Sequence, residues 1–208
     1  MTEGYDLIHD LGCIVEPWTC GFLEFENDFY KTDVKEYKKL RDSILDCDNG
    51  TLISDLVLHK YGAWARQLLE TEDTYLLNEQ YIIKPPSIFG LSQFAWHRDS
   101  DYYDDVRHRQ EPTVACWTAL DDVNRFNGTV ELVDFQNNSY LLEVPAGSIL
   151  FMSHRLLHHS TSNSSPQKFR RAYMAQFSKQ PLVYFDKKED LPLASRCVAL
   201  AVKTCGLP

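Results

Sequence analysis

The sequence predicts an all-β core with helical additions (α+β), arranged as a double-sheet jelly roll, or double-stranded β-helix, with N-terminal helices packed on it. Two observations predict this fold. The hydrophobic period changes near residue 78 from three or four, which is typical of helices, to two, which is typical of strands. From there on, short strands alternate with tight turns at nearly regular intervals, as in antiparallel sandwiches and barrels. The chain of 208 residues has the size of a single domain.

Helices are expected before residue 78. Asp33 can cap the charged segment VKEYKKLRDSIL, and the residues DNGT (48–51) form a turn after it. A second helix is indicated by an apolar stripe in steps of three and four residues. This stripe consists of Ile53, Val57, Tyr61, Trp64 and Leu68. We therefore expect residues 1–77 to be the mainly helical part of one domain that spans residues 1–208.

The expected strands lie between residues 78 and 180, and residues 181–208 form a C-terminal extension. The dipeptide Asn127-Gly128 is a strong hairpin signal within this region. The segment TVACWTALDD (113–122) is apolar on both faces, as in a strand that is buried on both sides. The other expected strands are EQYIIK (79–84), which ends at two prolines, SYLLEV (139–144), SILFMS (148–153) and FRRAYMAQFS (169–178).

Composition narrows the range of functions. The formal net charge is −9, with 30 acidic against 21 basic residues, which argues against a nucleic-acid binder and against binding to anionic membranes. No apolar run approaches the ~18 residues of a membrane helix, and the N-terminus lacks the pattern of a secretory signal. The six cysteines form no CxxC pair, so free thiols in a reducing compartment are expected. These features predict a cytoplasmic protein.

The segment FAWHRD (94–99) predicts a metal site. His97 and Asp99 are two positions apart, so both face the same side of a strand, and buried charged groups are costly unless they are paired or bind a metal. A third ligand can come from SHRLLHHSTSN (153–163), which contains His154, His158 and His159. Two histidines and one carboxylate form the facial triad of Fe(II) oxygenases. A zinc hydrolase and a simple surface His–Asp pair remain alternatives, because zinc takes the same ligands.

The residues FRRA (169–172) add a second signal. An arginine on the strand after the distal histidine can hold a carboxylate with two parallel hydrogen bonds. A 2-oxoglutarate-dependent oxygenase needs such a cation, because its co-substrate chelates the metal at one end and carries a free carboxylate at the other. The His–Asp motif and the arginine together favour this enzyme class over a chance motif.

Six segments together resemble the phytanoyl-CoA dioxygenase-like family of Fe(II)/2-oxoglutarate oxygenases. They lie in order from about residue 78 to 178 and read QYIIKPP, WHRDS, ACWTALDD, FNGTV, PAGSILFMSHRLLHHS and FRRA. The resemblance implies Fe(II), 2-oxoglutarate and O₂ as the reactants at the site, with His97 and Asp99 as the proximal metal ligands. The distal ligand of the family begins a His-x-Ser pattern followed by Asn, which fits His158, Ser160 and Asn163. His159 is then expected to point to the other face, and His154 is a candidate to support the metal ligands without binding the metal.

The resemblance also implies the co-substrate contacts. Arg170 would hold the far carboxylate of 2-oxoglutarate, assisted by Ser160. Arg171 remains the alternative to Arg170, because the spacing from the histidine is one residue longer than in some relatives. Trp117 would line the pocket and Gln80 would hydrogen-bond 2-oxoglutarate, although plain core packing and a strand-edge cap explain these two residues equally simply.

The sequence does not identify the substrate. The segment DSDYYDDVRHRQEP (99–112) follows the proximal ligands and offers Tyr102, Tyr103, Arg107 and Arg109 as substrate contacts, with a solvated surface loop as the alternative. The function expected is oxidation of a small molecule at an unactivated C–H bond, by hydroxylation, desaturation or cyclisation, with succinate and CO₂ as co-products. The alternative from a different class is a non-catalytic, metal-binding jelly roll that binds a ligand or a partner.

Overall fold

Two antiparallel sheets form the core of the protein. The structure is a computed structural model, and it describes residues 55–86, 92–103, 106–180, 182 and 202–204. The first expected helix and the turn at 48–51 lie outside the described residues. The helical elements are η1 (Asp55–Tyr61), α5 (Gly62–Leu69), η2 (Asp99–Tyr102) and α6 (Val106–Gln110). The strands are β1 (Tyr75–Lys84), β2 (Phe94–His97), β3 (Thr113–Ala119), β4 (Val130–Val133), β5 (Ser139–Leu141), β6 (Ile149–Ser153), β7 (Leu157–Ser160), β8 (Arg170–Ser178) and β9 (Val202–Lys203).

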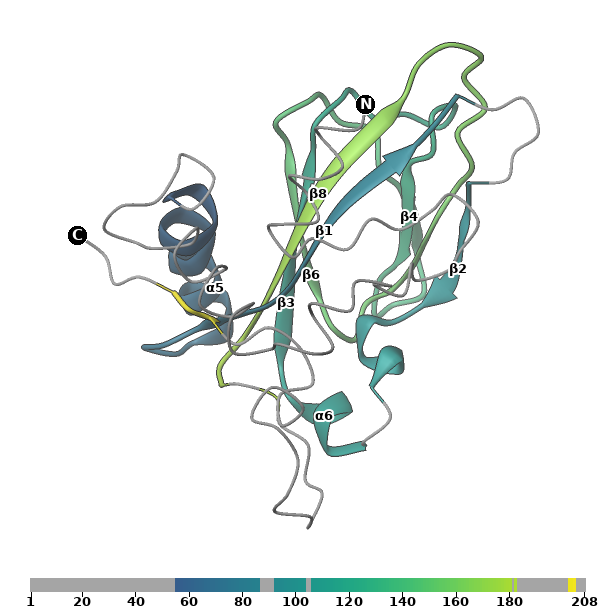
Figure 1. Cartoon of the computed structure of the whole chain (residues 1–208). Coiled ribbons are helices and arrows are strands. Elements are labelled where there is room, and N and C mark those ends of the chain that lie inside the picture. The colour runs from purple at the N-terminus through teal and green to yellow at the C-terminus, as the bar shows by residue number, and fades with distance from the viewer. Residues whose placement is uncertain (1–54, 87–91, 104–105, 181, 183–201, 205–208) are drawn as a thin grey trace, which may run out of the picture.

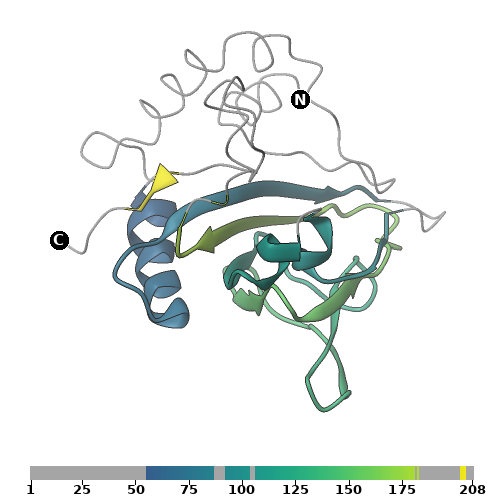
Figure 2. The ribbon, with the colours of Figure 1, turned by 90° about the horizontal axis from the view of Figure 1, so that it is seen from below.

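The sheets have the strand orders of a jelly roll. The larger sheet has the order β6-β3-β8-β1-β9, and the smaller sheet has the order β2-β7-β4-β5. Neighbouring strands run antiparallel in both sheets. Helix α5 lies on the side of β1 and β3 away from β2 and β4, and α6 lies beyond the end at which β3 begins (Figure 1, Figure 2). The predicted jelly roll with an added helix is confirmed.

The large sheet is buried on both faces, which explains its continuous apolar runs. Every residue of β3 is buried. One face packs on η1 and α5 through Leu58, Tyr61, Val114, Cys116 and Phe177, among others. The opposite face forms the interior between the sheets and carries Ile82, Ala115, Trp117, Ala172 and Met174. Because successive side chains alternate, this interior face also receives Lys84 from β1 and Arg170 from β8.

The apolar stripe of the second helix is different from the expected one. Trp64 is 36% exposed and Leu68 is 54% exposed, whereas Ala65 and Leu69 are buried. The cause is that residues Asp55–Tyr61 form a π-helix, which has more residues per turn than an α-helix. The buried positions therefore advance by four residues at each step, and the expected step of three at Trp64 is wrong. Among the described residues, no helix has the length and apolar character that a membrane crossing requires.

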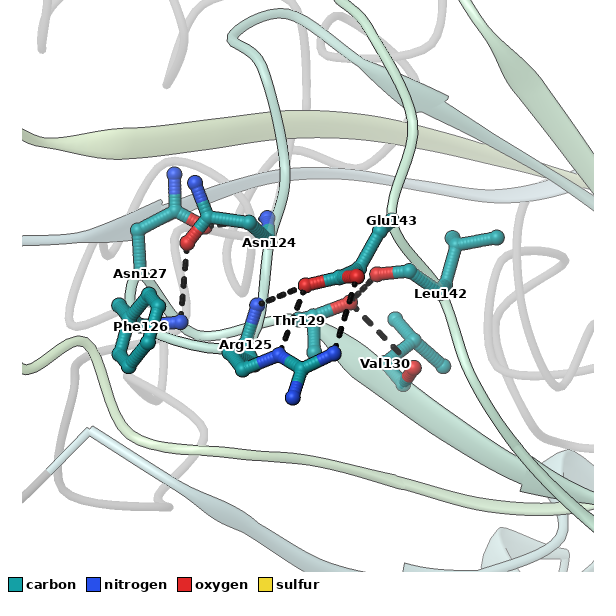
Figure 3. A network of polar contacts seen from close by, with 8 residues as sticks. All are labelled: Asn124, Arg125, Phe126, Asn127, Thr129, Val130, Leu142 and Glu143. Atoms are coloured by element: carbon teal, nitrogen blue, oxygen red, sulfur yellow. Dashed lines mark hydrogen bonds and ion pairs between the residues drawn. The ribbon is translucent and has the colours of Figure 1, made fainter.

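Asn127 and Gly128 do not form the turn of a hairpin. They lie in the connection that leaves the large sheet at Ala119 and enters the small sheet at Val130, and the hairpin prediction is wrong here. The side chain of Asn127 instead stabilises the loop, because its Oδ1 accepts from the Asn124 amide at 2.8 Å. Figure 3 shows the neighbouring polar contacts, in which the Arg125 guanidinium pairs with Glu143. Gly128 adopts a φ of 91°, which side chains rarely tolerate.

Candidate metal centre and co-substrate pocket

Strands β2 and β7 bring two histidines together. The two strands pair antiparallel, and His97 is the register partner of His158. Their ring centroids are 4.3 Å apart. Residues Phe94–His97 and Leu157–Ser160 form short strands of the small sheet, so both rings are held on a rigid hydrogen-bonded frame.

Asp99 approaches these histidines from a short 3₁₀-helix. The helix η2 begins directly after β2, and the Arg98 amide donates to Asp101 Oδ2 at 2.9 Å, which caps its first turn. The Ser100 amide also donates to the backbone oxygen of His154 at 3.1 Å. These contacts tie η2 to the end of β6 and fix the carboxylate, which is buried.

The three side chains form a compact cluster of metal-ligand type. Oδ1 of Asp99 lies 3.9 Å from Nε2 of His97 and 3.7 Å from Nε2 of His158. One ligand atom from each residue lies within 4.8 Å of the other two. Burial lowers the pKa of His97, so its imidazole is neutral at physiological pH and its free nitrogen can bind a metal.

The tautomers of both histidines also fit a metal. Nδ1 of His97 lies 2.8 Å from the Ala95 carbonyl oxygen, and Nδ1 of His158 lies 3.0 Å from the Leu156 carbonyl oxygen. A carbonyl oxygen can only accept, so each Nδ1 must carry the proton in these hydrogen bonds. Each Nε2 then presents its lone pair towards Asp99, which is the usual arrangement of metal-binding histidines.

The other two histidines of the 153–163 segment lie elsewhere. His159 points to the opposite face of β7, where its Nε2 lies 2.9 Å from Glu131 Oε2 and its ring packs on Trp96. His154 is buried behind Asp99, with Nδ1 3.4 Å from the Thr113 amide. Neither residue contributes an atom to the cluster of three.

Arg170 and Arg171 take opposite sides of β8. Arg170 is 1% exposed and faces the interior, where Nε and Nη1 have no hydrogen-bond partner among the described residues. Burial lowers its pKa to about 9, so the guanidinium still carries its charge at neutral pH. Arg171 is exposed and forms two hydrogen bonds to Asp121, at 2.9 and 2.6 Å. Of the two candidates, only Arg170 faces the interior with unpaired donors.

Lys84 is a second buried cation that the sequence analysis missed. It is 1% exposed, and it is the register partner of Arg170 on the neighbouring strand. Its Nζ donates to Ser160 Oγ at 2.6 Å and to the Thr161 backbone oxygen at 2.5 Å. Ser160 lies two residues after His158 on β7, and its hydroxyl contacts the lysine. The sequence did contain a signal: Lys84 follows Gln80 and Ile82 at intervals of two residues, so all three side chains lie on the same face of the strand.

Trp117 and Gln80 also lie on the interior face of the large sheet. The Arg170 guanidinium carbon lies 5.6 Å from the centre of the Trp117 ring. Gln80 is buried on β1 opposite Met174, which belongs to the same apolar cluster as Trp117. Trp117 therefore adjoins the arginine, and Gln80 is buried on the same interior face.

The expected substrate contacts are divided between exposed and packed positions. Tyr102 is half exposed, and its ring packs edge-on against His97 with 5.2 Å between centroids. Tyr103 packs on the buried His108, and burial together with the Asp99 charge raises its pKa. Arg109 donates through Nε to the Tyr103 backbone oxygen at 2.5 Å. Arg107 is exposed on α6. Tyr102 is thus the candidate that the structure places against a proposed ligand.

The arrangement fits both groups that the sequence predicts. The two oriented imidazoles and the carboxylate are a facial set of donors for Fe(II). The guanidinium of Arg170, with Nε and Nη1 unpaired within the described part of the chain, lies in a buried, low-dielectric interior, where a charge is costly and a carboxylate ligand would relieve that cost. The interior therefore offers a metal site and a carboxylate site on one chain.

Comparisons with known proteins agree with this geometry. The sequence profile described as Phytanoyl-CoA dioxygenase (PhyH) matches residues 24–134, just over half of the chain. No curated protein sequence matches. Among solved structures, the α-ketoglutarate-dependent carbocyclase SnoK from nogalamycin biosynthesis is similar, with a TM-score of 0.57 and 18% identity over 76% of this chain and 73% of SnoK.

Two further structures share the fold. The α-ketoglutarate-dependent epimerase SnoN from nogalamycin biosynthesis has a TM-score of 0.55 and 18% identity, over 74% of this chain and 69% of SnoN. EctD from S. alaskensis, solved with 2-oxoglutarate and 5-hydroxyectoine, has a TM-score of 0.54 and 16% identity, over 74% of this chain and 63% of EctD. The chain spans only 27% of the EvdMO1 structure and 62% of ThoJ. Together with the cluster of His97, Asp99 and His158, the match over residues 24–134 shows that this chain belongs to the phytanoyl-CoA dioxygenase family of Fe(II)/2-oxoglutarate-dependent oxygenases.

Proposed function

We propose that the protein is an Fe(II)/2-oxoglutarate-dependent oxygenase that oxidises a small molecule at an unactivated C–H bond. One oxygen atom of O₂ enters succinate, which forms with CO₂ from 2-oxoglutarate, and the second oxidises the substrate. The observation that carries this proposal is the buried Arg170 guanidinium, whose Nε and Nη1 find no partner among the described residues and lie in the interior that the metal cluster also faces. A site that only bound a metal would gain nothing from this buried charge.

Each residue of the site has a distinct part in this reaction. His97, Asp99 and His158 would hold Fe(II), which supplies the oxidising chemistry when it is bound. Arg170 would hold the far carboxylate of 2-oxoglutarate through N–H groups of its guanidinium, of which those on Nε and Nη1 have no partner among the described residues. Lys84 would add a second positive charge next to this carboxylate and hold Ser160 Oγ in place.

The apolar residues of the interior would keep water out of the co-substrate pocket. Trp117 and Met174 belong to the buried cluster on this face of the large sheet. Excluding water strengthens the attraction between the guanidinium and a carboxylate, because the local dielectric constant is lower. Tyr102, which packs on His97 and is half exposed, is a candidate contact for the substrate where it enters.

The outcome of the oxidation is not fixed by the fold. The carbocyclase SnoK and the epimerase SnoN share this fold at 18% identity each. The substrate and the choice among hydroxylation, desaturation and cyclisation therefore depend on side chains at the entrance rather than on the metal ligands. We place this choice with the segment that carries Tyr102, Tyr103, Arg107 and Arg109.

The test is a screen of small molecules with the protein, Fe(II) and 2-oxoglutarate. Succinate formation and O₂ uptake are measured together, and a true substrate should raise both in equal amounts. The Arg170→Leu and His158→Ala variants are the negative controls. Before the screen, anaerobic addition of Fe(II) and 2-oxoglutarate should produce a visible charge-transfer band, which reports chelation without turnover.

Two results would contradict this proposal. A protein that binds the metal but gives no charge-transfer band and no succinate is a non-catalytic binding protein. Hydrolysis of a substrate with Zn²⁺, independent of 2-oxoglutarate and unaffected by Arg170→Leu, would indicate a zinc hydrolase instead. The matched Arg171→Leu variant separates a specific role of Arg170 from a general loss of positive charge.

A further inference from the structure

The two oxygens of the Asp99 carboxylate have different surroundings. Oδ1 faces the two histidines, at 3.9 Å from Nε2 of His97 and 3.7 Å from Nε2 of His158. Oδ2 instead accepts a hydrogen bond of 2.7 Å from Nε2 of Gln176. Gln176 is buried, so water does not compete strongly for this contact. Oδ1 therefore faces the two histidines, and Oδ2 faces the amide of Gln176.

Gln176 is well placed to control this carboxylate. It lies on β8, the central strand of the large sheet, where its register partners are Ala115 on β3 and Asn78 on β1. The small side chain of Ala115 leaves space on the interior face for a long amide to extend. Asp99 belongs to a different element, the short helix η2. The hydrogen bond therefore ties the carboxylate to the central strand of the large sheet.

The chemistry of the amide gives this contact a fixed direction. A glutamine amide does not ionise at physiological pH, and its NH₂ group donates to an anionic oxygen while its carbonyl oxygen would be repelled. A carboxylate oxygen that accepts such a charge-assisted hydrogen bond has part of its negative charge neutralised. Oδ2 is therefore a poorer metal ligand than Oδ1, in addition to being held on the far side.

We infer that Gln176 is a positioning residue that keeps Asp99 bound to the metal through one oxygen only. This inference rests on the proposed function. A facial triad with a one-oxygen carboxylate leaves three adjacent positions of an octahedral metal, two for 2-oxoglutarate and one for O₂. If Oδ2 also bound, only two positions would remain, and the co-substrate would compete with O₂. Gln176 thus preserves the third position without touching the metal.

The test counts the water molecules on a bound metal, which does not depend on turnover. Mn²⁺ replaces Fe(II), and the longitudinal relaxation of water protons measures the exchangeable waters in its inner coordination sphere. Wild-type protein should retain about three waters on an octahedral ion, because the chain supplies three ligand atoms. Gln176→Met, which has the same length and no donor, should retain about two, so the inner-sphere relaxivity should fall by about a third.

A matched control removes a different buried polar group from the same face of β8. Ser178 lies two residues after Gln176, is buried, and donates to the Gln180 backbone oxygen rather than to Asp99. Ser178→Ala should keep about three waters on Mn²⁺, as the wild type does. Gln176→Leu provides a second variant without a donor, and melting curves of the metal-free proteins confirm that each variant is folded.

The outcomes separate this inference from the proposed function. A Gln176→Met complex with the wild-type number of waters overturns the role of Gln176, whatever 2-oxoglutarate does. Addition of 2-oxoglutarate to the wild-type Mn²⁺ complex should displace about two waters, because the 2-oxo acid end binds through two atoms. A wild type whose waters are unaffected by 2-oxoglutarate contradicts the proposed function but leaves the comparison between Gln176 variants valid.

Discussion

Arg170 lies over Trp117, with its guanidinium carbon 5.6 Å from the centre of the indole ring. The two residues come from the adjacent strands β8 and β3, and both side chains face the interior between the two sheets. The indole face gives the cation partial compensation, which is worth about 0.5–2 kcal/mol. This is less than the cost of an unpaired buried charge, so the stacking alone does not satisfy Arg170.

Arg170→Leu should greatly weaken the binding of 2-oxoglutarate. The carboxylate would remain buried without its cation, and breaking such a pair costs about 3–5 kcal/mol, which corresponds to about 100-fold or more in affinity. The apparent KM for 2-oxoglutarate, or its Kd by anaerobic titration of the charge-transfer band, measures the effect. Arg171→Leu is the matched control and should change this KM less than about threefold, because the free-energy change expected from losing an exposed ion pair is small.

The control variant Arg171→Leu also has a predicted effect on stability that depends on pH. Hydrogen bonds from Arg171 lower the pKa of Asp121. A carboxyl with a lowered folded-state pKa contributes stability above its unfolded pKa, and this contribution is lost as the pH falls through the folded value. Arg171→Leu should therefore unfold more easily than the wild type at pH 7, by at most about 1 kcal/mol, and this difference should shrink as the pH falls towards 2. Urea unfolding at both pH values checks this, and a difference that grows in acid would contradict it.

Much of the site could be predicted because it depends on local spacing. His97 and Asp99 are two residues apart, and a strand followed by one turn keeps two such residues close together. The choice between Arg170 and Arg171 could not be made from spacing, because one residue of loop length reverses which side chain faces inward. The structure shows which of the two faces inward: Arg170 is buried and pairs in register with Lys84, and its role with 2-oxoglutarate stays a prediction.

The features that could not be predicted depend on contacts between distant segments. Lys84 precedes two prolines and resembled a polar strand end, yet its nitrogen reaches Ser160, 76 residues later. Gln176 meets Asp99 across 77 residues. The dipeptide Asn127-Gly128 has the sequence of a hairpin turn, but packing between the two sheets determines its conformation. Local patterns carry no information about such pairings when only one sequence is read.

The distal metal ligand can be tested with two adjacent histidines. His158→Ala should abolish tight metal binding and turnover, because it removes one of the three clustered ligand atoms. His159→Ala should retain metal binding, since that ring faces Glu131 on the other side of β7. Metal content after dialysis against Fe(II) under anaerobic conditions, together with succinate formation, measures both effects. Normal metal binding in His158→Ala with loss in His159→Ala would assign the ligand to the other histidine.

Lys84→Met should weaken the binding of the co-substrate without lowering the stability of the protein. Replacing a buried charge by an apolar side chain of similar length is often neutral or stabilising, so the melting temperature of the metal-free protein should not fall. The affinity for 2-oxoglutarate should decrease, because a positive charge beside its carboxylate is lost. Thermal melting and anaerobic titration of the same preparation measure the two quantities. A large loss of stability with unchanged affinity would show that Lys84 has a structural role only.

Two glycines with positive φ provide a test of whether the loop at 120–129 supports the co-substrate pocket. Gly128 has a φ of 91° and Gly147 a φ of 87°, so alanine at either position should cost about 1–2 kcal/mol in backbone strain. Their surroundings differ, because a β-carbon on Gly128 would lie 2.6 Å from Cδ of Lys84, whereas one on Gly147 would meet none of the residues that the structure describes within 4 Å. Such a β-carbon on Gly128 would also lie 3.1 Å from the Thr161 backbone oxygen, which accepts from Lys84.

Gly128→Ala should therefore displace Lys84 in addition to straining the backbone. We expect it to be less stable than Gly147→Ala in urea unfolding and to bind 2-oxoglutarate more weakly, while Gly147→Ala retains wild-type affinity. The double variant Gly128→Ala/Lys84→Met separates the two causes, because it keeps the backbone strain of alanine but has no lysine charge to displace. If the lysine transmits the effect, adding Gly128→Ala to Lys84→Met should weaken 2-oxoglutarate binding no further. Equal affinity in Gly128→Ala and Gly147→Ala would mean that the loop does not influence the pocket through Lys84.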